Sequence, residues 1–503
     1  MAGFGWGTLL QKAVLLVRGC FRDWATTLTV LLTVVRGILA FIPIPVTWDE
    51  AVYTNLARDY YYLGFYYYFP FQVVLDFARA PVLPLSIYVA FLLTGPNHTV
   101  AQLVTYAYSV AAVYMVYLLG KDMYGERVGC LSALAFSCSP FLLVSSWGVL
   151  TEPPFMFFAA LFLLSVYRAQ RKPYYYVLSG VTLTLTTLTR YPGFLMILVG
   201  VFLTVSLGNA RVTVRSPWFY AGIGAAVATV TPWLIYSKNV TGAYLGFLQV
   251  FFASTQQWTR NPYLILATTP LDLAVSGVYD LIAMAAIPGT LIPYFLWGVK
   301  AGRMKVEGRT LIFWVISYAA AYGVLMRMAR LVDYLRYNET SLPAVAVLSA
   351  MGIAVLLGEG EVKLDGVRSL MAGKRKVALA LIAVNFIAGL AGVYVVRSEP
   401  GISVPIPVYE YMKATTLPCE TILSNVYPMV SYYTDRIAMW FPQVPWLRDF
   451  TLKNLNVKYV LFNLYRYCPP DALMYVEAHP EMFERVLVYG GILVYRVANA
   501  SSP

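Results

Sequence analysis

The stretch "PVTWDEAVYTNLARDYYYLG", Pro45 to Gly64, sets two adjacent carboxylates, Asp49 and Glu50, directly after an apolar segment. That segment, roughly Ala25–Pro45, is long enough to cross a hydrocarbon core of about 30 Å. It is the first of about eleven such runs, since a spanning helix needs about 20 mostly apolar residues. The chain therefore places acidic side chains at the boundary of a membrane.

The composition fits a polytopic α-helical membrane protein. Of 503 residues, 59% are hydrophobic and only 12% are charged, about half the charged share of soluble domains. The net charge of +12 is explained by basic residues flanking spans on the cytoplasmic side rather than by nucleic-acid binding. None of the five cysteines forms a CxxC pair, which argues against a zinc or redox site.

The remaining apolar runs predict the topology. They lie near 100–119, 128–146, 153–167, 174–189, 194–207, 217–236, 274–298, 310–328, 343–357 and 377–396. With the N-terminus in the cytoplasm, the short inner loops carry most of the loop Lys and Arg, as the positive-inside rule requires. The four N-x-S/T sequons, at Asn97, Asn239, Asn338 and Asn499, then all lie outside. We expect a multi-pass protein of the cell membrane with an extracytoplasmic active site.

Two domains are expected. Residues 1–396 form the transmembrane domain, whose first outer loop, 46–99, contains interfacial helices, because Tyr53, Leu56 and Tyr60 recur at helical spacing. Residues 397–503 form a small extracytoplasmic α/β domain, with strands at "TILSNV", "KYVLFNL" and the hairpin "RVLVYGGILVYRV". Cys419 and Cys468 both fall in this outer domain, so a disulfide between them is left open.

Charged side chains gather at the predicted outer edge, and each also has a simpler structural explanation. Asp49 either caps a helix that begins at Glu50 or acts as a general base, for which burial would raise its proton affinity. Arg79 either snorkels to the headgroups or pairs with a phosphate. Glu152, before two prolines, either starts a helix or faces an outer cavity. Arg190 either marks a span edge or binds an anion.

The segment "RMARLVDYLRYNETSLP" concentrates arginines on the face that the positive-inside rule disfavours. Arg327, Arg330 and Arg336 there suggest an anion, and an Arg fork suits a phosphate diester. No glycine-rich nucleotide loop is present, so the phosphate is expected to belong to a lipid.

These motifs resemble those of the GT-C glycosyltransferases. "TWDEAVYTNLARDYYYLG" is similar to their acidic entry motif, "RAPVLPLSIYVAFLLTG" to their proline segment, and "YLLGKDMYGERVGCLSALAFSCSPF" to their hairpin. "LTEPPFMFF", "TLTRYPG" and "RYNETSLPAVAVL" follow in the family's order. The resemblance covers most of 48–343 and is closest to the branch that contains aminoarabinose transferases and protein O-mannosyltransferases.

The resemblance implies transfer of a sugar, a mannose-like hexose, from a polyprenyl or dolichyl phosphate to a hydroxyl acceptor on a protein, lipid or glycan. It assigns Asp49 as catalytic base with Glu50 beside it. Arg190 and Arg336, with Tyr337 and Arg79, would hold the lipid phosphate, although many members have another residue at Arg79. Glu152 and Arg58 would lie on the acceptor side. The resemblance also implies inversion at the sugar.

No metal site is predicted, because the chain has only two histidines, His98 and His479; a divalent cation, Mg or Mn, is left open. The alternative function is a membrane transporter or lipid-binding protein without catalytic activity, which would place charges inside the spans. Arg36 and Asp280 are the main such charges. An adhesion protein acting through its outer domain would not need arginines at span edges. The low His content and many Tyr and Val fit a thermophilic archaeon.

Overall fold

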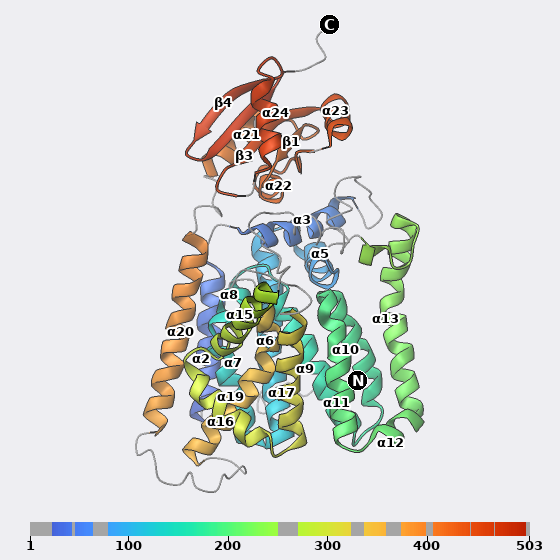
Figure 1. Ribbon diagram of the computed structural model, residues 1–503, viewed down its shortest axis with the longest axis vertical. Helices are drawn as coiled ribbons and strands as arrows, with labels where there is room; N and C mark the ends of the chain where they lie inside the picture. The colour runs from blue at the N-terminus through green and yellow to red at the C-terminus, as the bar shows by residue number, and fades with distance from the viewer. Residues whose placement is uncertain are drawn as a thin grey trace, which may run out of the picture.

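A computed structural model of the protein describes residues 23–42, 46–63, 79–249, 270–322, 336–358, 374–398, 406–442, 444–466 and 468–498. A bundle of helices carries a small sheet domain at one end (Figure 1). The helices of the bundle are α2 Trp24–Ala40, α5 Val82–Thr94, α6 His98–Tyr124, α7 Glu126–Ser137, α8 Pro140–Trp147, α9 Glu152–Ala169, α10 Tyr175–Thr189, α11 Met196–Ser206, α12 Ala210–Arg215, α13 Pro217–Thr241, α15 Pro270–Ala286, α16 Ile292–Gly302, α17 Val306–Ala320, α19 Leu342–Leu357 and α20 Lys374–Ser398. Short 3₁₀ turns are η1 Tyr191–Leu195, η2 Gly289–Leu291 and η4 Glu339–Ser341.

Within the described residues, four helices are long and apolar enough to cross a membrane, and the pair α7 and α8, bent by 60°, raises this to five. Two of these helices have apolar outward faces: Val227 of α13 and Ile387 of α20 are 56% and 61% exposed. Contiguous apolar surface of this kind marks a lipid-facing protein. The chain is thus a multi-pass membrane protein, and the number of eleven spans stays a prediction.

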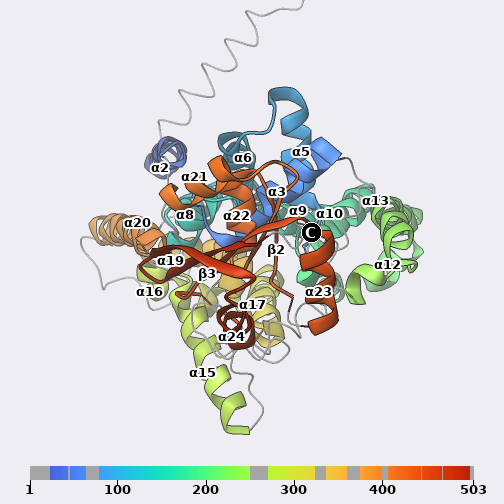
Figure 2. The same ribbon diagram turned by 90° about the horizontal axis from the view of Figure 1, so that it is seen from above.

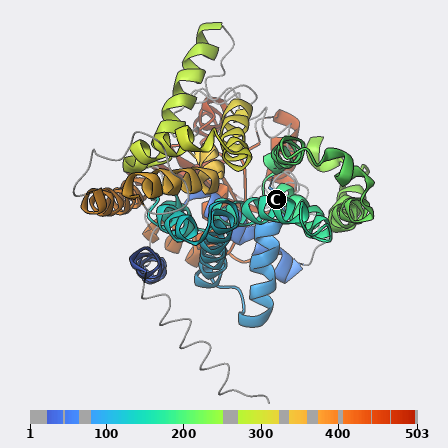
Figure 3. The same cartoon turned by 90° about the horizontal axis from the view of Figure 1, so that it is seen from below.

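The predicted single span 274–298 is wrong, because two helices occupy it. α15 ends at Ala286 and α16 begins at Ile292. Pro288 lacks an amide donor, and Gly289 adopts a φ of 57° that favours glycine. Views along the bundle from its two ends show α15 projecting away from the other helices (Figures 2 and 3).

The centre of the bundle is α19, whose residues are almost all buried. It packs on α16 at very short range: a Cβ added to Gly298 would lie 1.7 Å from the Leu348 carbonyl oxygen. Gly352 has the same role on α19, because a Cβ added there would lie 1.8 Å from the Tyr294 carbonyl oxygen of α16. Small residues let membrane helices approach in this way.

The C-terminal domain is a five-stranded sheet in the order β2-β1-β3-β5-β4, flanked by helices. Its elements are α21 Ile406–Thr415, β1 Thr421–Ser424, α22 Tyr427–Thr434, β2 Ile437–Met439, α23 Pro445–Asn454, β3 Val457–Asn463, α24 Pro470–Ala478, β4 Phe483–Tyr489 and β5 Ile492–Val497. β1 is parallel to β2 and β3, whereas β5 is antiparallel to β3 and β4. The predicted α/β domain is confirmed, with the short β2 added. Cys419 and Cys468 are free thiols.

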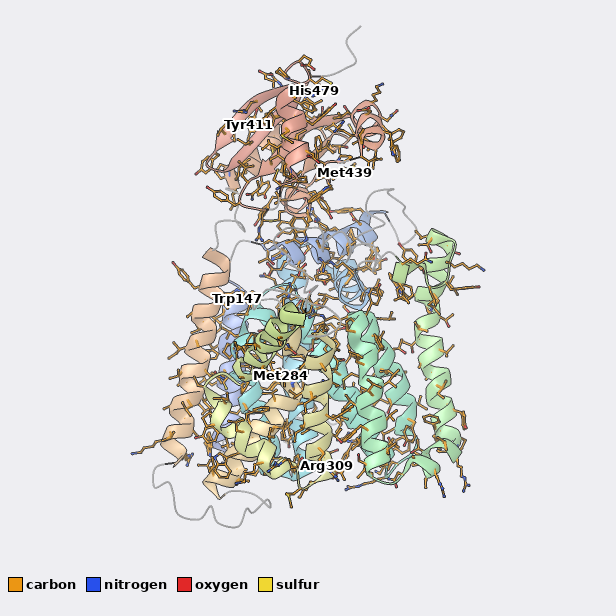
Figure 4. All side chains as sticks on the ribbon, viewed as in Figure 1. Trp147, Met284, Arg309, Tyr411, Met439 and His479 are labelled. Atoms are coloured by element: carbon orange, nitrogen blue, oxygen red, sulfur yellow. The ribbon has the colours of Figure 1, made fainter. Side chains whose placement is uncertain are left out.

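α3, Trp48–Leu63, lies across the end of the bundle beneath the C-terminal domain (Figure 1), as expected of an interfacial helix. Trp147, in a predicted outer turn, lies toward that end, and Arg309, in a predicted inner loop, lies at the other (Figure 4). Which end faces the cytoplasm stays a prediction. One sequon is unsuited to a glycan, because Asn338 is 1% exposed.

Candidate active site

The site begins at the first turn of α3. The helix starts at Trp48, and the amide of Thr47 donates to the Glu50 carboxylate at 2.6 Å, which is half of a capping box. Asp49 is therefore not the N-cap, and that structural explanation is wrong. The Asp49 side chain instead contacts arginines from other parts of the chain.

Asp49 joins two guanidinium groups. Arg79 Nη2 donates to one carboxylate oxygen at 2.9 Å, and Arg336 Nη2 lies 2.5 Å from the other. Arg79 precedes α5, and Arg336 precedes η4 and α19. Asp49 is 8% exposed, so these are charge-assisted bonds in a largely dehydrated place.

Glu152 continues the network. It opens α9, where the following prolines suit the first helical turn. One of its carboxylate oxygens accepts from Arg190 Nη1 at 2.8 Å and from Arg336 Nε at 2.8 Å. Glu152 is fully buried, and Arg336 thus bridges the two acids. Three guanidiniums face two carboxylates, which leaves one positive charge uncompensated within this ion cluster.

Aromatic rings line the cluster. The Arg190 guanidinium lies 5.2 Å from the Tyr337 ring centroid, and Tyr337 stacks on Tyr322 with centroids 5.1 Å apart. Arg79 lies 5.6 Å from the Tyr53 ring. Such cation–π contacts orient guanidiniums at modest energetic gain. The Arg336 side chain remains 36% exposed, more than that of Arg79 or Arg190, so it is the guanidinium most open to a ligand.

The pKa of Asp49 is lowered, contrary to the expectation of a raised value. Burial acts to raise the pKa, but the charges of Arg336, Arg79 and Arg190 outweigh burial. The same partnership raises the pKa of Arg79. In the free protein Asp49 is therefore a stable carboxylate, and it is a weak base as long as both arginines hold it.

Two predicted site residues lie outside the ion cluster. Besides capping α3, Glu50 accepts a hydrogen bond from the Val149 amide at 3.2 Å. Arg58 reaches the C-terminal domain, where it pairs with Asp435. Their catalytic and acceptor-side roles stay predictions. Arg327 and Arg330 lie outside the described residues.

Three residues beside the cluster were not among the predicted site residues. Glu339 is 4% exposed and lies within electrostatic reach of Glu152, Arg336 and Arg190. Tyr53 and Tyr322 supply ring faces. Glu339 had one signal, its position three residues after Arg336; Tyr322 had none, because its neighbours in the sequence are apolar.

Among the residues that the structure describes, no group of three or more His, Cys, Asp or Glu side chains could hold a metal ion. The described contacts of Asp49 and of one Glu152 oxygen are to guanidiniums. The described residues thus do not form a recognisable cation site.

Residues 78–236, less than half of the chain, match the model of a family described as dolichyl-phosphate-mannose-protein mannosyltransferase. No curated protein matches in sequence. The structure of ArnT from Cupriavidus metallidurans bound to undecaprenyl phosphate is similar with a TM-score of 0.66 at 15% identity, covering 94% of this chain and 99% of that one. The chain has the GT-C fold.

Two further GT-C structures are similar over most of their length. The apo Archaeoglobus fulgidus oligosaccharyltransferase matches with a TM-score of 0.58 at 14% identity, covering 87% of this chain and 69% of that one. AglB from Archaeoglobus fulgidus, in complex with an inhibitory peptide and a dolichol-phosphate, matches with 0.54 at 14% identity, covering 96% and 75%. The resemblance to the GT-C superfamily is confirmed at the level of the fold.

Proposed function

We propose that this chain is an integral-membrane glycosyltransferase, a hexosyltransferase that moves a mannose-like sugar from a polyprenyl or dolichyl phosphate to a hydroxyl acceptor on the outer face. The observation that carries the proposal is the bridge of Arg336 between Asp49 and Glu152. This bridge supports the proposal, because a carboxylate suited to act as a base and a guanidinium suited to bind phosphate lie in contact. ArnT and AglB, which share the fold, are seen with undecaprenyl phosphate and dolichol-phosphate.

Charge supports a phosphate ligand. Arg79, Arg190 and Arg336 outnumber their two carboxylate partners by one, and a sugar phosphodiester carries one negative charge. Binding the donor would therefore balance the charges of these three arginines and their two carboxylate partners. A guanidinium can hold two phosphate oxygens at once, and a buried pocket with little competing water strengthens that contact.

An apolar groove offers a place for the lipid chain. It has a volume of about 530 Å³ between α15 and α17, and Val278, Leu281 and Ile316 are among its lining residues. Its lining also includes Ala320, two residues before Tyr322, whose ring stacks on Tyr337 at the ion cluster. A polyprenyl chain in this groove would bring its phosphate toward Arg190.

In the proposed step the acceptor oxygen attacks the anomeric carbon while Asp49 takes the hydroxyl proton. The bond from that carbon to the phosphate oxygen breaks, and its electron pair leaves with the lipid phosphate, whose growing charge the arginines stabilise. Direct displacement inverts the sugar. A positioned base contributes about 10²–10⁴-fold, and alignment of the two reactants supplies much of the rest.

The lowered pKa of Asp49 gives this mechanism an order of events. With Arg336 and Arg79 bound to it, the carboxylate is a poor proton acceptor. A phosphate that draws Arg336 away would remove the largest charge holding this pKa down. Donor binding would thus prepare the base, and the enzyme would avoid proton abstraction before its donor is in place.

The test is transfer of label from radiolabelled dolichyl phosphate mannose, with other dolichyl phosphate hexoses in parallel, to protein, lipid and glycan fractions of membranes containing the protein. Arg336→Ala should lower transfer about 100-fold or more, in the range lost when a donor to developing charge is removed. Arg309→Ala is the matched control and should transfer sugar at the wild-type rate, because Arg309 is exposed at the opposite end of the molecule.

Two results would reject the proposal. One is normal transfer by Arg336→Ala. The other is tight binding of dolichyl phosphate by the wild type with no transfer from any hexose donor, which would favour the lipid-binding alternative.

A further inference from the structure

We propose that α22 of the C-terminal domain fixes the position of Asp49 by clamping α3, and that Arg58 is a positioning residue of this clamp. The inference rests on the proposed function for the role of Asp49, but the clamp itself can be tested without activity. α22 lies directly above α3 in Figure 1, and the two helices overlap in the view from above (Figure 2). Their contacts are both apolar and polar.

The apolar contacts make α3 part of the C-terminal domain's core. Val46 and Ala51 belong to one buried cluster with Val408, Met429 and Val430. The Trp48 ring meets the Tyr427 ring edge-on, with centroids 5.5 Å apart. Trp48 is the residue directly before Asp49, so the core of the outer domain extends to the catalytic position.

The polar contacts recur along the same face of α3. Asn55 Nδ2 donates to the Pro428 carbonyl at 2.9 Å, and Arg58 Nη1 donates to the Tyr432 carbonyl at 3.4 Å. Arg58 also forms an ion pair with Asp435. Ala51, Asn55 and Arg58 are four and three residues apart, which places them on one side of a helix.

Asp435 joins three helices. It is the C-cap of α22 in the left-handed conformation, with a φ of 55°, which Asp tolerates better than most residues. Its carboxylate pairs with Arg58 of α3 and with Lys413 of α21. The ion pair therefore ties the catalytic helix to the frame of the C-terminal domain rather than to a single side chain.

The opposite side of α3 faces the bundle. Tyr53 and Ala57 share a buried cluster with Leu83 and Ile87 of α5, and Asp49 meets its arginines on this side. α3 is thus held between two domains. A change in the outer contacts would shift Asp49 against arginines that stand on the bundle.

The geometry makes such a shift significant. Arg58 lies nine residues after Asp49, which is about 13.5 Å along a helix. A tilt of roughly 4° about the Arg58 end therefore moves Asp49 by about 1 Å, and a misplacement of that size costs on the order of 10²-fold in rate. Donor binding should suffer less, because Arg190 and Arg336 do not belong to α3.

The experiment compares full-length Arg58→Ala and Asp435→Asn with Arg58→Lys in lipid nanodiscs. Arg496→Ala is the matched control, since it breaks an exposed ion pair with Glu484 in the same domain, away from α3. Hydrogen exchange over residues 47–63 measures the clamp. Transfer kinetics with dolichyl phosphate mannose measure its effect on kcat and on the KM for donor.

We expect at least threefold faster exchange in 47–63 for Arg58→Ala and Asp435→Asn, and a kcat about tenfold or more below wild type with donor KM within twofold. Arg58→Lys should recover most of both, and Arg496→Ala should match wild type. Exchange in 47–63 that is unchanged in Arg58→Ala and Asp435→Asn would overturn the inference, as would a loss confined to donor KM. If the wild type transfers no sugar, the proposed function fails while the exchange result still decides the clamp.

Discussion

Replacing Asp49 by Asn should strengthen the binding of the lipid phosphate while stopping transfer. In the free protein Asp49 accepts a bond from Arg79 at 2.9 Å and lies 2.5 Å from Arg336. A phosphate must compete with that carboxylate for Arg336. Asn keeps the shape of the side chain but removes its negative charge, so the competition weakens.

The magnitude follows from the bond that is lost. A hydrogen bond that involves a charged group contributes roughly 1.5–3 kcal/mol; the Arg336–Asp49 bond, charged at both ends, lies at the upper end of that range, and an Arg336–Asn bond, charged only at the donor, lies at the lower end. Breaking the bond to Arg336 should therefore cost about 1–1.5 kcal/mol less in Asp49→Asn than in the wild type, which corresponds to about 5–13-fold tighter binding of the phosphate. Transfer should fall about 10²–10⁴-fold, because the base is gone.

The assay measures equilibrium binding of dolichyl phosphate, without a sugar, to wild type and Asp49→Asn in nanodiscs, at an ionic strength held constant because charge contacts are screened by salt. Single-turnover transfer is measured on the same preparations. Weaker binding by Asp49→Asn would refute the competition between carboxylate and phosphate. Near wild-type transfer would refute the assignment of Asp49 as base.

Two further predictions concern stability, measured by thermal unfolding in detergent. Burial raises the pKa of Asp59 on α3 from 3.8 to about 7, despite the nearby charge of Arg58; the folded protein then holds a proton that the unfolded chain releases, so stability falls as the pH rises across that window. At 1.36 kcal/mol per pKa unit the full shift is worth about 4 kcal/mol of stability, and the partial exposure of Asp59 reduces this to roughly 1–2 kcal/mol. Asp59→Asn should therefore be more stable than the wild type at pH 8 and no more stable at pH 4. A pH profile of stability that is the same in both proteins would contradict this. Gly298→Ala should destabilise the folded protein by about 1–3 kcal/mol or more, because the added methyl group would overlap the Leu348 carbonyl. Gly224→Ala is the control and should not destabilise it, since a methyl group there meets nothing within 4 Å. Equal melting temperatures for the two variants would show that α16 and α19 can move apart.

The sequence was most informative where one physical rule dominated. Apolar length predicted the helical membrane body, and alternating strands with a Gly-Gly turn predicted the hairpin now seen as β4 and β5. The motif order also indicated which distant charges belong together: Asp49, Arg79, Glu152, Arg190 and Arg336 do form one cluster. Opposite charges at a membrane boundary have few alternatives to pairing, which made this inference robust.

The sequence was least informative where partners come from the tertiary structure. Asp49 and Glu50 are adjacent and chemically alike, yet one meets arginines and the other caps α3 and holds the Val149 amide. The direction of the Asp49 pKa shift was wrong because burial was weighed without the three arginines. Arg58 looked like a site residue, but the face it occupies on α3 sends it to Asp435. None of these outcomes depends on residue type alone.

A cryo-EM structure of the protein with bound dolichyl phosphate tests the proposed role of the arginines most directly. We expect phosphate oxygens within hydrogen-bond distance of Arg336 and Arg190, with the bond between Arg336 and Asp49 broken and Asp49 facing the site of the acceptor. A phosphate bound away from these arginines, with Arg336 still bridging Asp49 and Glu152, would contradict it.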